Sequence, residues 1–164
     1  MMDAIRIREA TIDDARAIAE VQVAGWHAAY RGLVPDAVLD GVTMAVREPA
    51  WVKNLAESSG PRTTVLERGG RVVAFGCFGP SRYEEGLGEV WALYVAPEAW
   101  RTGAGRALLH EGLRSLDAHP AVMLWVLEGN ARAIRFYEAC GFRLDGTRLD
   151  KDALPQLGMR RGRS

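Results

Sequence analysis

The chain has 164 residues, of which 48% are hydrophobic and 26% are charged, and its 21 basic and 21 acidic side chains give a formal net charge of zero. This length and composition predict one globular domain over residues 1–164 and exclude a disordered or fibrous chain. The balanced charge excludes a bulk electrostatic attraction, so we predict no nucleic-acid partner and no membrane partner.

The N-terminal part begins with a predicted strand at residues 5–8, where apolar and polar side chains alternate. Thr11 and Asp14 then have the spacing of a capping box ahead of an apolar stripe at helical intervals, which predicts a helix over 12–29. Two further helical segments are predicted, at 36–39 and 43–55.

The middle of the chain predicts β-structure. Residues 63–66 and 71–75 are rich in β-branched and apolar side chains and flank Gly69 and Gly70. Paired glycines accept the positive φ of a tight turn, so these segments are predicted to form a hairpin. Aromatic and β-branched residues predict a fourth strand at 89–96.

The C-terminal part alternates helices and strands. The predicted elements are a helix at 103–116, a strand at 121–127, a helix capped by Asn130 that reaches Cys140, and strands at 142–149 and 156–160. A hairpin forces antiparallel neighbours, whereas a helix between the fourth and fifth strands permits parallel pairing. We therefore predict an α+β fold with a mixed, mostly antiparallel sheet of six to seven strands flanked by helices.

Metal binding and export are not indicated by the sequence. Cys77 and Cys140 lack the paired spacing of a zinc or redox site, and His110 and His119 have no metal-ligand partners at useful spacing, so no metal is predicted. The charged N-terminus lacks the apolar core of a signal peptide, and nowhere do about 18 uncharged apolar residues run together. We expect a soluble protein of the cytoplasm.

A glycine-containing turn between residues 100 and 108 joins a predicted strand to a predicted helix. Gly103 and Gly105 allow backbone N–H groups to approach an anion at the positive end of the helix, which indicates a phosphate site. A P-loop is excluded because no Gly-Lys-Ser/Thr follows, and a Rossmann fingerprint is weak because Leu108 stands at its third glycine or alanine position. Alternatively, the glycines serve only a tight connection.

A second block of sequence lies at 124–130 and 133–142, where a strand and a helix capped by Asn130 are followed by Phe-Tyr-Glu-x-x-Gly-Phe. Together with the glycine turn, this block resembles the GCN5-related N-acetyltransferase (GNAT) superfamily. That family's pyrophosphate turn has the pattern Arg/Gln-x-x-Gly-x-Gly/Ala. Here Trp100 stands at the first position and Arg101 follows one place late.

The resemblance implies the GNAT acyl-CoA N-acyltransferase fold, and an acetyl-CoA-dependent N-acetyltransferase in which a primary amine attacks the thioester directly. The implied cofactor-binding residues are Leu93, Tyr94 and Val95 through their main chain, Arg101, Thr102, Gly103, Ala104, Gly105 and Arg106 of the turn, and Asn130 and Tyr137. Asn130 could equally serve only as a helix cap.

Two catalytic residues follow from the resemblance. Tyr137 is the implied general acid, because a phenol with a pKa of about 10 stays neutral at pH 7; the alternative is a core tyrosine packed against Phe136. Glu89 is the candidate base, acting directly or through water, and in a regular strand it shares a face with Trp91, Leu93 and Val95. An exposed strand-end carboxylate, selection of free amine from solution, and the weaker rivals Glu84, Glu85 and Glu128 remain open.

The acceptor side is indicated by aromatic residues. Trp26 and Tyr30 close the first helix and Trp125 lies on a neighbouring strand, where the resemblance implies the acceptor wall; aromatic residues at such spacing are also common in a core. His27 is expected to be an ordinary surface or hydrogen-bonded histidine. The expected acceptor is a small-molecule amine or a protein N-terminus. A homodimer is left open.

The rival function is a non-catalytic module that binds an acyl-CoA or a partner protein.

Overall fold

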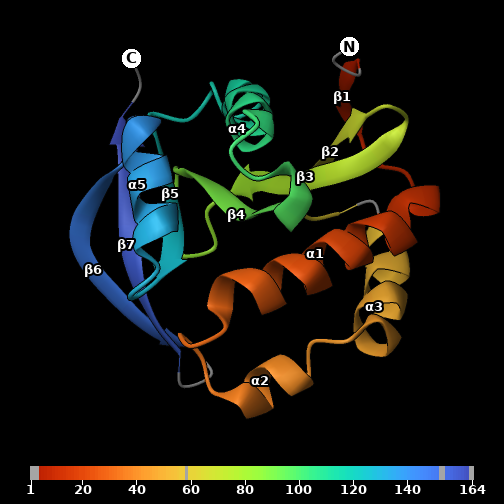
Figure 1. The fold of residues 1–164 in the computed structure, drawn as a ribbon. Helices are drawn as coiled ribbons and strands as arrows, with labels where there is room; N and C mark the ends of the chain where they lie inside the picture. Colours follow the sequence, from red (N-terminus) through yellow and green to blue (C-terminus); the bar gives the residue numbers. More distant parts are fainter. Residues whose placement is uncertain (1–3, 58, 152–153, 163–164) are drawn as a thin grey trace.

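A seven-stranded open sheet separates two layers of helices in the computed structural model, which describes residues 4–57, 59–151 and 154–162 (Figure 1). The strands are β1 (Ile5–Glu9), β2 (Arg62–Arg68), β3 (Arg71–Pro80), β4 (Gly88–Val95), β5 (Ala121–Leu127), β6 (Arg143–Lys151) and β7 (Leu154–Gly162). Their order across the sheet is β1-β2-β3-β4-β5-β7-β6. Among the described strands of this sheet, only the β4–β5 pair is parallel, which confirms the predicted mixed, mostly antiparallel sheet.

The helices cover both faces of this sheet. They are α1 (Ala15–Tyr30), α2 (Asp36–Asp40), α3 (Met44–Ala56), α4 (Ala104–Arg114) and α5 (Ala131–Ala139), with single 3-10 turns at Ile12–Asp14 and Pro97–Ala99. On one face, α1 and α3 bury a cluster that includes Ile18 and Phe75. On the other face, α4 and α5 cover a cluster that includes Leu109 and Phe142. No helix in the described ranges is long and apolar enough to cross a membrane.

The predicted elements are confirmed, with differences at their ends. The helix predicted from residue 12 begins with the 3-10 turn, because Asp14 turns back to accept a hydrogen bond from the Thr11 backbone N–H (2.8 Å). The same carboxylate pairs with Arg8 of β1 (2.7 Å), which joins the start of α1 to the sheet. The last predicted strand is longer than its pattern indicates and lies between β5 and β6 as β7.

Strand β4 departs from the predicted alternation at Trp91. The adjacent β3 residues Cys77 and Phe78 pair with Ala92 and Val90, so Trp91 is the extra residue of a β-bulge. The face predicted for a regular strand is therefore interrupted at the bulge: Leu93 and Val95 still contact one cluster, whereas Trp91 packs against the cluster under α1.

The faces of β4 show the effect of the bulge. Val90 and Leu93, three residues apart, both contact the cluster under α4 and α5. Ala92 and Tyr94 pack instead against the cluster under α1. A regular strand would have placed Val90 with Ala92 and Tyr94.

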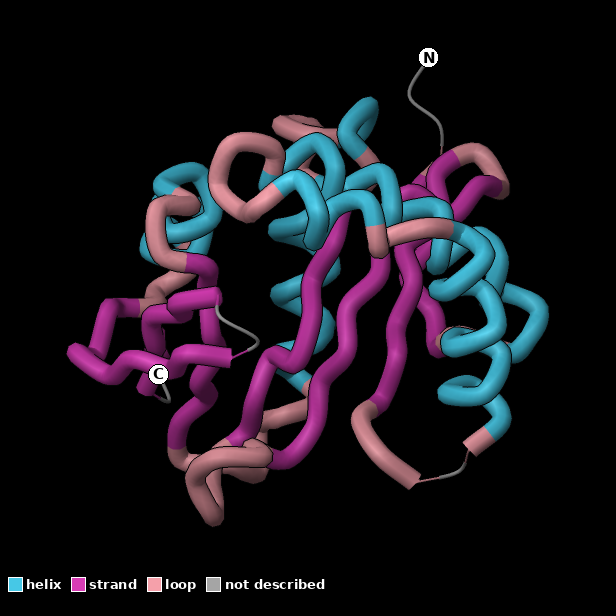
Figure 2. The backbone as a smooth tube through the Cα atoms, turned by 90° about the horizontal axis from the view of Figure 1, so that it is seen from below, coloured by secondary structure: helices cyan, strands magenta, loops and turns pink. Residues whose placement is uncertain are grey.

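The sheet opens at the same point. Strands β4 and β5 pair only from Gly88 to Val90, opposite Val122 to Leu124, and the remainder of β4 pairs with no described strand on that side. Seen from below, the C-terminal strands diverge from the rest of the sheet (Figure 2). The second half of β4 is therefore a strand edge that lies inside the molecule.

We predict that a methyl group at Gly112 destabilises the fold. An added Cβ would lie 2.1–2.5 Å from ring atoms of Phe78, a side chain that is only 1% exposed and cannot move aside. Gly112→Ala is expected to lower the free energy of unfolding by about 1–3 kcal/mol in urea denaturation, although alanine favours a helix.

The matched control is Gly25→Ala in α1, where the added Cβ would meet Tyr94 at an ordinary 3.5 Å. This variant should have unchanged or slightly higher stability. Equal changes in the two variants would contradict the proposed packing.

Candidate functional site

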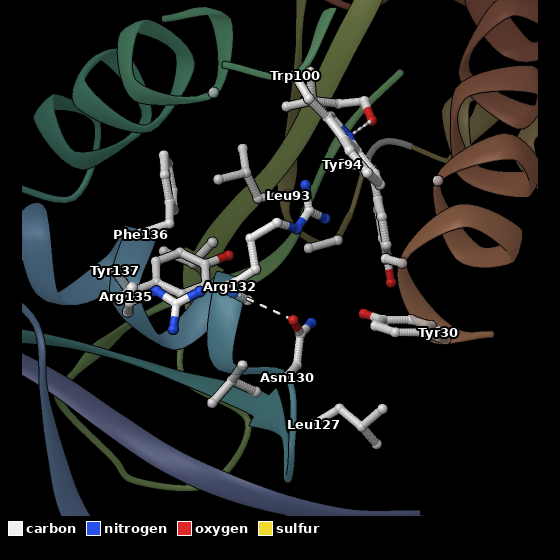
Figure 3. Close-up of a pocket in the computed structure, with 18 of the residues that line it drawn as sticks. Tyr30, Leu93, Tyr94, Trp100, Leu127, Asn130, Arg132, Arg135, Phe136 and Tyr137 are labelled. Carbon is white, nitrogen blue, oxygen red and sulfur yellow. Dashed lines mark hydrogen bonds between the residues drawn. The ribbon is translucent and has the colours of Figure 1, made fainter. Parts of the chain in front are cut away.

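A cavity of about 610 Å³ lies where β4 and β5 separate. Its walls come from the end of α1, the second half of β4, the loop that leads to α4, the end of β5, and α5 (Figure 3). Residues that are distant in the sequence, such as Tyr30, Leu93 and Asn130, meet around it. The volume is in the range of sites for small molecules and cofactors.

The backbone of β4 offers the main-chain groups of Leu93 and the Val95 N–H to this cavity, whereas the Val95 oxygen already accepts the Trp100 indole N–H (2.9 Å). The Ala96 N–H donates to the Val73 oxygen of β3 (2.8 Å), and strand alternation therefore directs the main-chain groups of Leu93 and Val95 to the opposite side. The same alternation directs the main chain of Tyr94 to β3, so Tyr94 reaches the cavity by its side chain. An extended ligand could pair with Leu93 and Val95 as an added strand.

The turn before α4 is shaped by two residues with positive φ, Arg101 (62°) and Gly103 (87°). The Ala107 N–H donates to the Gly103 oxygen (3.0 Å), and the N–H groups before it in the first turn have no helical partner. A Cβ at Gly105 would lie 3.3 Å from Val95 and 3.5 Å from the Phe136 ring. The backbone of the turn therefore packs closely against Val95 and Phe136, at the positive end of the helix, where an anion can bind.

Four arginines line the cavity: Arg101 and Arg106 at the turn, and Arg132 and Arg135 on α5. None of them forms an ion pair with any residue that the structure describes. The described residues of the lining include no Asp or Glu. This end of the cavity is therefore suited to a ligand with several negative charges.

Arg132 and Arg135 were not among the site residues predicted from the sequence. The available signal was their spacing of three residues on the helix capped by Asn130, which places them on the same side of α5. No function was predicted for Trp100 either. The Trp100 indole donates to the Val95 oxygen (2.9 Å), and its ring lies under the Arg132 guanidinium, 3.5 Å from ring centroid to Cζ.

Two residues of the predicted turn do not line the cavity. The Thr102 hydroxyl donates to the Ala99 oxygen (2.5 Å) and accepts from Arg68 (3.1 Å). Ala104 is fully buried in the core beneath α4. Only the backbone of these two residues is available to a ligand.

Tyr137 extends from α5 with its hydroxyl toward the centre of the cavity (Figure 3). Its ring packs edge-on against Phe136 (5.2 Å between centroids) and Phe142 (5.7 Å). Burial raises the pKa of the Tyr137 hydroxyl above its ordinary value, so the hydroxyl is a neutral donor at physiological pH. The sequence left open whether Tyr137 is a core residue or a residue of the site. In the structure its ring packs in the core and its hydroxyl reaches the cavity.

Asn130 caps α5, as predicted: its Oδ1 accepts a hydrogen bond from the Ala133 N–H (3.2 Å). The Asn130 side chain also lines the cavity, opposite Tyr30 (Figure 3). Because the oxygen serves the helix, the amide NH₂ group is the part available to a ligand.

Glu89 is fully buried and is not among the residues that line the cavity. Its carboxylate accepts three hydrogen bonds from Arg82: from the backbone N–H (2.9 Å), from Nε (3.3 Å) and from Nη2 (2.6 Å). Arg82 in turn stacks on Trp91, the bulge residue, at 4.1 Å. This arrangement holds the loop that follows β3 against the start of β4.

The weaker carboxylate candidates also lie outside the lining. Glu84 pairs with Arg160, and Glu128 pairs with Arg148 (2.9 Å). Glu85 is exposed in the loop before β4 and does not line the cavity.

The predicted aromatic wall lies at the other end of the cavity. The Trp26 indole donates to the Tyr94 hydroxyl (2.9 Å), and its ring meets Tyr30 edge-on at 4.7 Å between centroids. Trp125 of β5 also lines the cavity, and its buried Nε1 has no hydrogen-bond partner among the described residues. His27 points elsewhere and bonds to the Val42 oxygen (2.9 Å), as expected of an ordinary histidine.

Comparison with known proteins yields a consistent set of similarities. The model of the acetyltransferase (GNAT) family matches residues 23–142. An uncharacterized N-acetyltransferase of Bacillus subtilis is 33% identical over 162 residues, covering 92% of this chain and 91% of its own. A probable N-acetyltransferase of Mycobacterium tuberculosis is 32% identical over 148 residues, covering 87% and 82%.

A similar solved structure is PaiA N-acetyltransferase from Thermoplasma acidophilum in complex with coenzyme A. It aligns with a TM-score of 0.80 over 97% of this chain and 99% of its own, at 19% identity. At that identity the likeness concerns the fold.

We predict an asymmetric effect of breaking the Arg82–Glu89 pair. The Glu89 side chain is 1% exposed and that of Arg82 is 36% exposed. Arg82→Ala leaves a buried carboxylate without its cation and should lower the free energy of unfolding by roughly 3 kcal/mol in urea denaturation. Glu89→Gln leaves an arginine that water can reach, so its effect should be smaller. A larger loss for Glu89→Gln would contradict the assigned geometry.

Proposed function

Because the chain belongs to the GNAT family of acetyl-CoA-dependent N-acetyltransferases, we propose that this cavity binds acetyl-CoA and presents its thioester to a primary amine. The set of functional groups around the cavity carries the proposal. Arginines without an ion-pair partner among the described residues, a helix N-terminus, a strand edge, a tyrosine and an aromatic wall line one cavity. Coenzyme A has phosphates, amides and a thioester, and each of these groups has a matching partner in that set.

The phosphates would lie on the turn and the pantetheine along β4. The N–H groups of Gly103 to Arg106 and the neighbouring guanidinium groups would neutralise the pyrophosphate. The main-chain groups of Leu93 and the N–H of Val95 would pair with the pantetheine amides, and the Asn130 NH₂ group would add a donor from α5. The N–H of Leu93, near the point where the strands part, is the proposed donor to the thioester oxygen.

The reaction forms one C–N bond and breaks one C–S bond. The amine lone pair attacks the thioester carbon, the C–S bond breaks with its electrons on sulfur, and one amine proton ends on the thiol. The Tyr137 hydroxyl would donate a hydrogen bond to the departing sulfur. Because a raised pKa makes it a weaker acid, it would stabilise the thiolate chiefly as a donor, with the proton supplied overall by the amine.

Removal of the amine proton before attack needs no carboxylate of the lining in this proposal. The amine would enter from solution already deprotonated. The nitrogen would lose its next proton to water in the open cavity when the C–N bond forms. Glu89 remains a predicted base that would first have to separate from Arg82.

A pH–rate profile of Glu89→Gln tests the two possibilities. If no carboxylate acts as base, the rate of this variant should still increase with pH as the fraction of free amine increases. A Glu89→Gln loss of about 100-fold in kcat, with Arg82→Ala fully active, would assign the base role to Glu89.

The acceptor would bind between α1 and β5. Trp26 and Tyr30 offer aromatic faces, which attract the cationic or polar end of an amine, and Trp125 lines the cavity from β5. The acceptor would be a primary amine of a small molecule or a protein N-terminus. Free-thiol release from acetyl-CoA on addition of an amine or peptide library identifies it, whereas the rival binding module would bind acetyl-CoA and release no thiol.

Tyr137→Phe is the first test of the chemistry. The ring packing is retained, so KM for acetyl-CoA should stay within about twofold, while kcat falls by on the order of 100-fold. Because burial raises the pKa, the wild-type hydroxyl stays protonated to about pH 10, and kcat should show no alkaline loss from its ionisation. Unchanged turnover of the variant across this pH range would remove Tyr137 from the mechanism.

Gly105→Glu is the second test and addresses the turn. A carboxylate beside the pyrophosphate should raise the Kd of acetyl-CoA on the order of 100-fold in calorimetric titration. Gly105→Gln has nearly the same size without the charge and should lose less. Normal binding by Gly105→Glu would place the cofactor elsewhere.

A further inference from the structure

We propose that Arg132 of α5, oriented by its stacking on Trp100, binds the pyrophosphate of the cofactor from the wall opposite the turn. This inference rests on the proposed function. In this arrangement Arg132 and Trp100 connect the two walls of the cavity across the bound cofactor, which the glycine turn alone cannot do.

Trp100 provides a fixed platform. Its Nε1 donates to the Val95 oxygen at 2.9 Å, so rotation of the ring would break a bond to a main-chain carbonyl at the cavity edge. Val95 ends β4 and the turn begins after it, so the platform lies between the free strand edge and the helix N-terminus. In Figure 3 the ring lies above the cavity on the side of Tyr94.

Arg132 reaches this platform from the other wall. It belongs to the first turn of α5, and its Cζ lies 3.5 Å from the Trp100 ring centroid. Stacking uses the flat face of the guanidinium and leaves its N–H groups, which lie in the plane, free to donate. No described residue forms an ion pair or a side-chain hydrogen bond with Arg132, so these donors are available for a planar, bidentate contact with phosphate oxygens.

The position of the Trp100–Arg132 stack indicates which part of the cofactor Arg132 would contact. A ligand whose amides pair with Leu93 and Val95 and whose phosphates reach the N–H groups of Gly103 to Arg106 must pass Trp100 between these points. In coenzyme A, the group between the pantetheine and the nucleoside is the pyrophosphate. Burial, and after it the charge of Arg101, lowers the pKa of Arg132, and an anion bound between the two guanidinium groups would relieve their repulsion.

The experiment compares three ligands in calorimetric titrations of the wild type and of Arg132→Met, which keeps an apolar chain and removes the cation. The ligands are acetyl-CoA, 3′-dephospho-acetyl-CoA, which keeps the pyrophosphate, and acetyl-pantetheine, which has no phosphate. We expect Arg132→Met to raise Kd roughly 10- to 100-fold for the first two and to leave the third unchanged. Arg114→Met, on the far end of α4, removes the same charge and should change Kd less than about twofold.

Trp100→Leu tests the platform. It should weaken acetyl-CoA binding, and its effect should shrink when Arg132 is already methionine, because both substitutions remove the same contact. Additive effects would mean that Trp100 does not orient Arg132.

Three results would overturn the assignment of Arg132: no effect on acetyl-CoA, an equal loss for acetyl-pantetheine, or a loss that disappears with the dephospho ligand. The last would place Arg132 at the 3′-phosphate. If the wild type itself binds no acetyl-CoA, the proposed function fails, whereas normal wild-type binding with an unaffected Arg132→Met variant refutes this inference alone.

Discussion

The separation of β4 from β5 after Val90 is the constraint on which the site depends. A parallel pair of strands would normally continue to bond, but the bulge at Trp91 changes the course of β4 and leaves its second half without a neighbour on one side. Backbone groups inside a protein must find partners, and here an extended ligand can supply them. The helices then contribute the rest: α4 its N-terminus, α5 its cap and its tyrosine, and α1 its aromatic end.

Charge is distributed unevenly around this cavity, although the chain has no net charge. Several arginines elsewhere pair with nearby carboxylates, as Arg148 does with Glu128 and Arg160 with Glu84. The arginines of the cavity have no such partners among the described residues, so a local cationic field remains in a neutral protein. The net charge of the sequence excluded broad attraction to polyanions and was silent about a site for one small anion.

The elements and the glycine turn could be predicted because their signals are local. Periodicity, an Asn cap and paired glycines act within a few residues, and the structure places Gly103, Gly105 and Asn130 at the cavity. The β4 bulge could not be predicted from β4 alone, because it is defined by the register against β3. The Arg82–Glu89 pair and the Trp100–Arg132 stack likewise join segments whose contact depends on tertiary structure. From the sequence alone, Glu89 could only be interpreted as a residue of a regular strand, and Trp100 as a departure from the family's motif.

The central claim is that the free edge of β4 and the turn before α4 bind one extended acetyl-CoA molecule. Amide hydrogen exchange resolved to single residues, with and without coenzyme A, tests it most directly. The account predicts slower exchange on binding at the N–H groups of Leu93 and Val95 and at those of Gly103 to Arg106, with that of Tyr94 unchanged because it already faces β3. Binding of coenzyme A without protection of Leu93 and Val95 would contradict it.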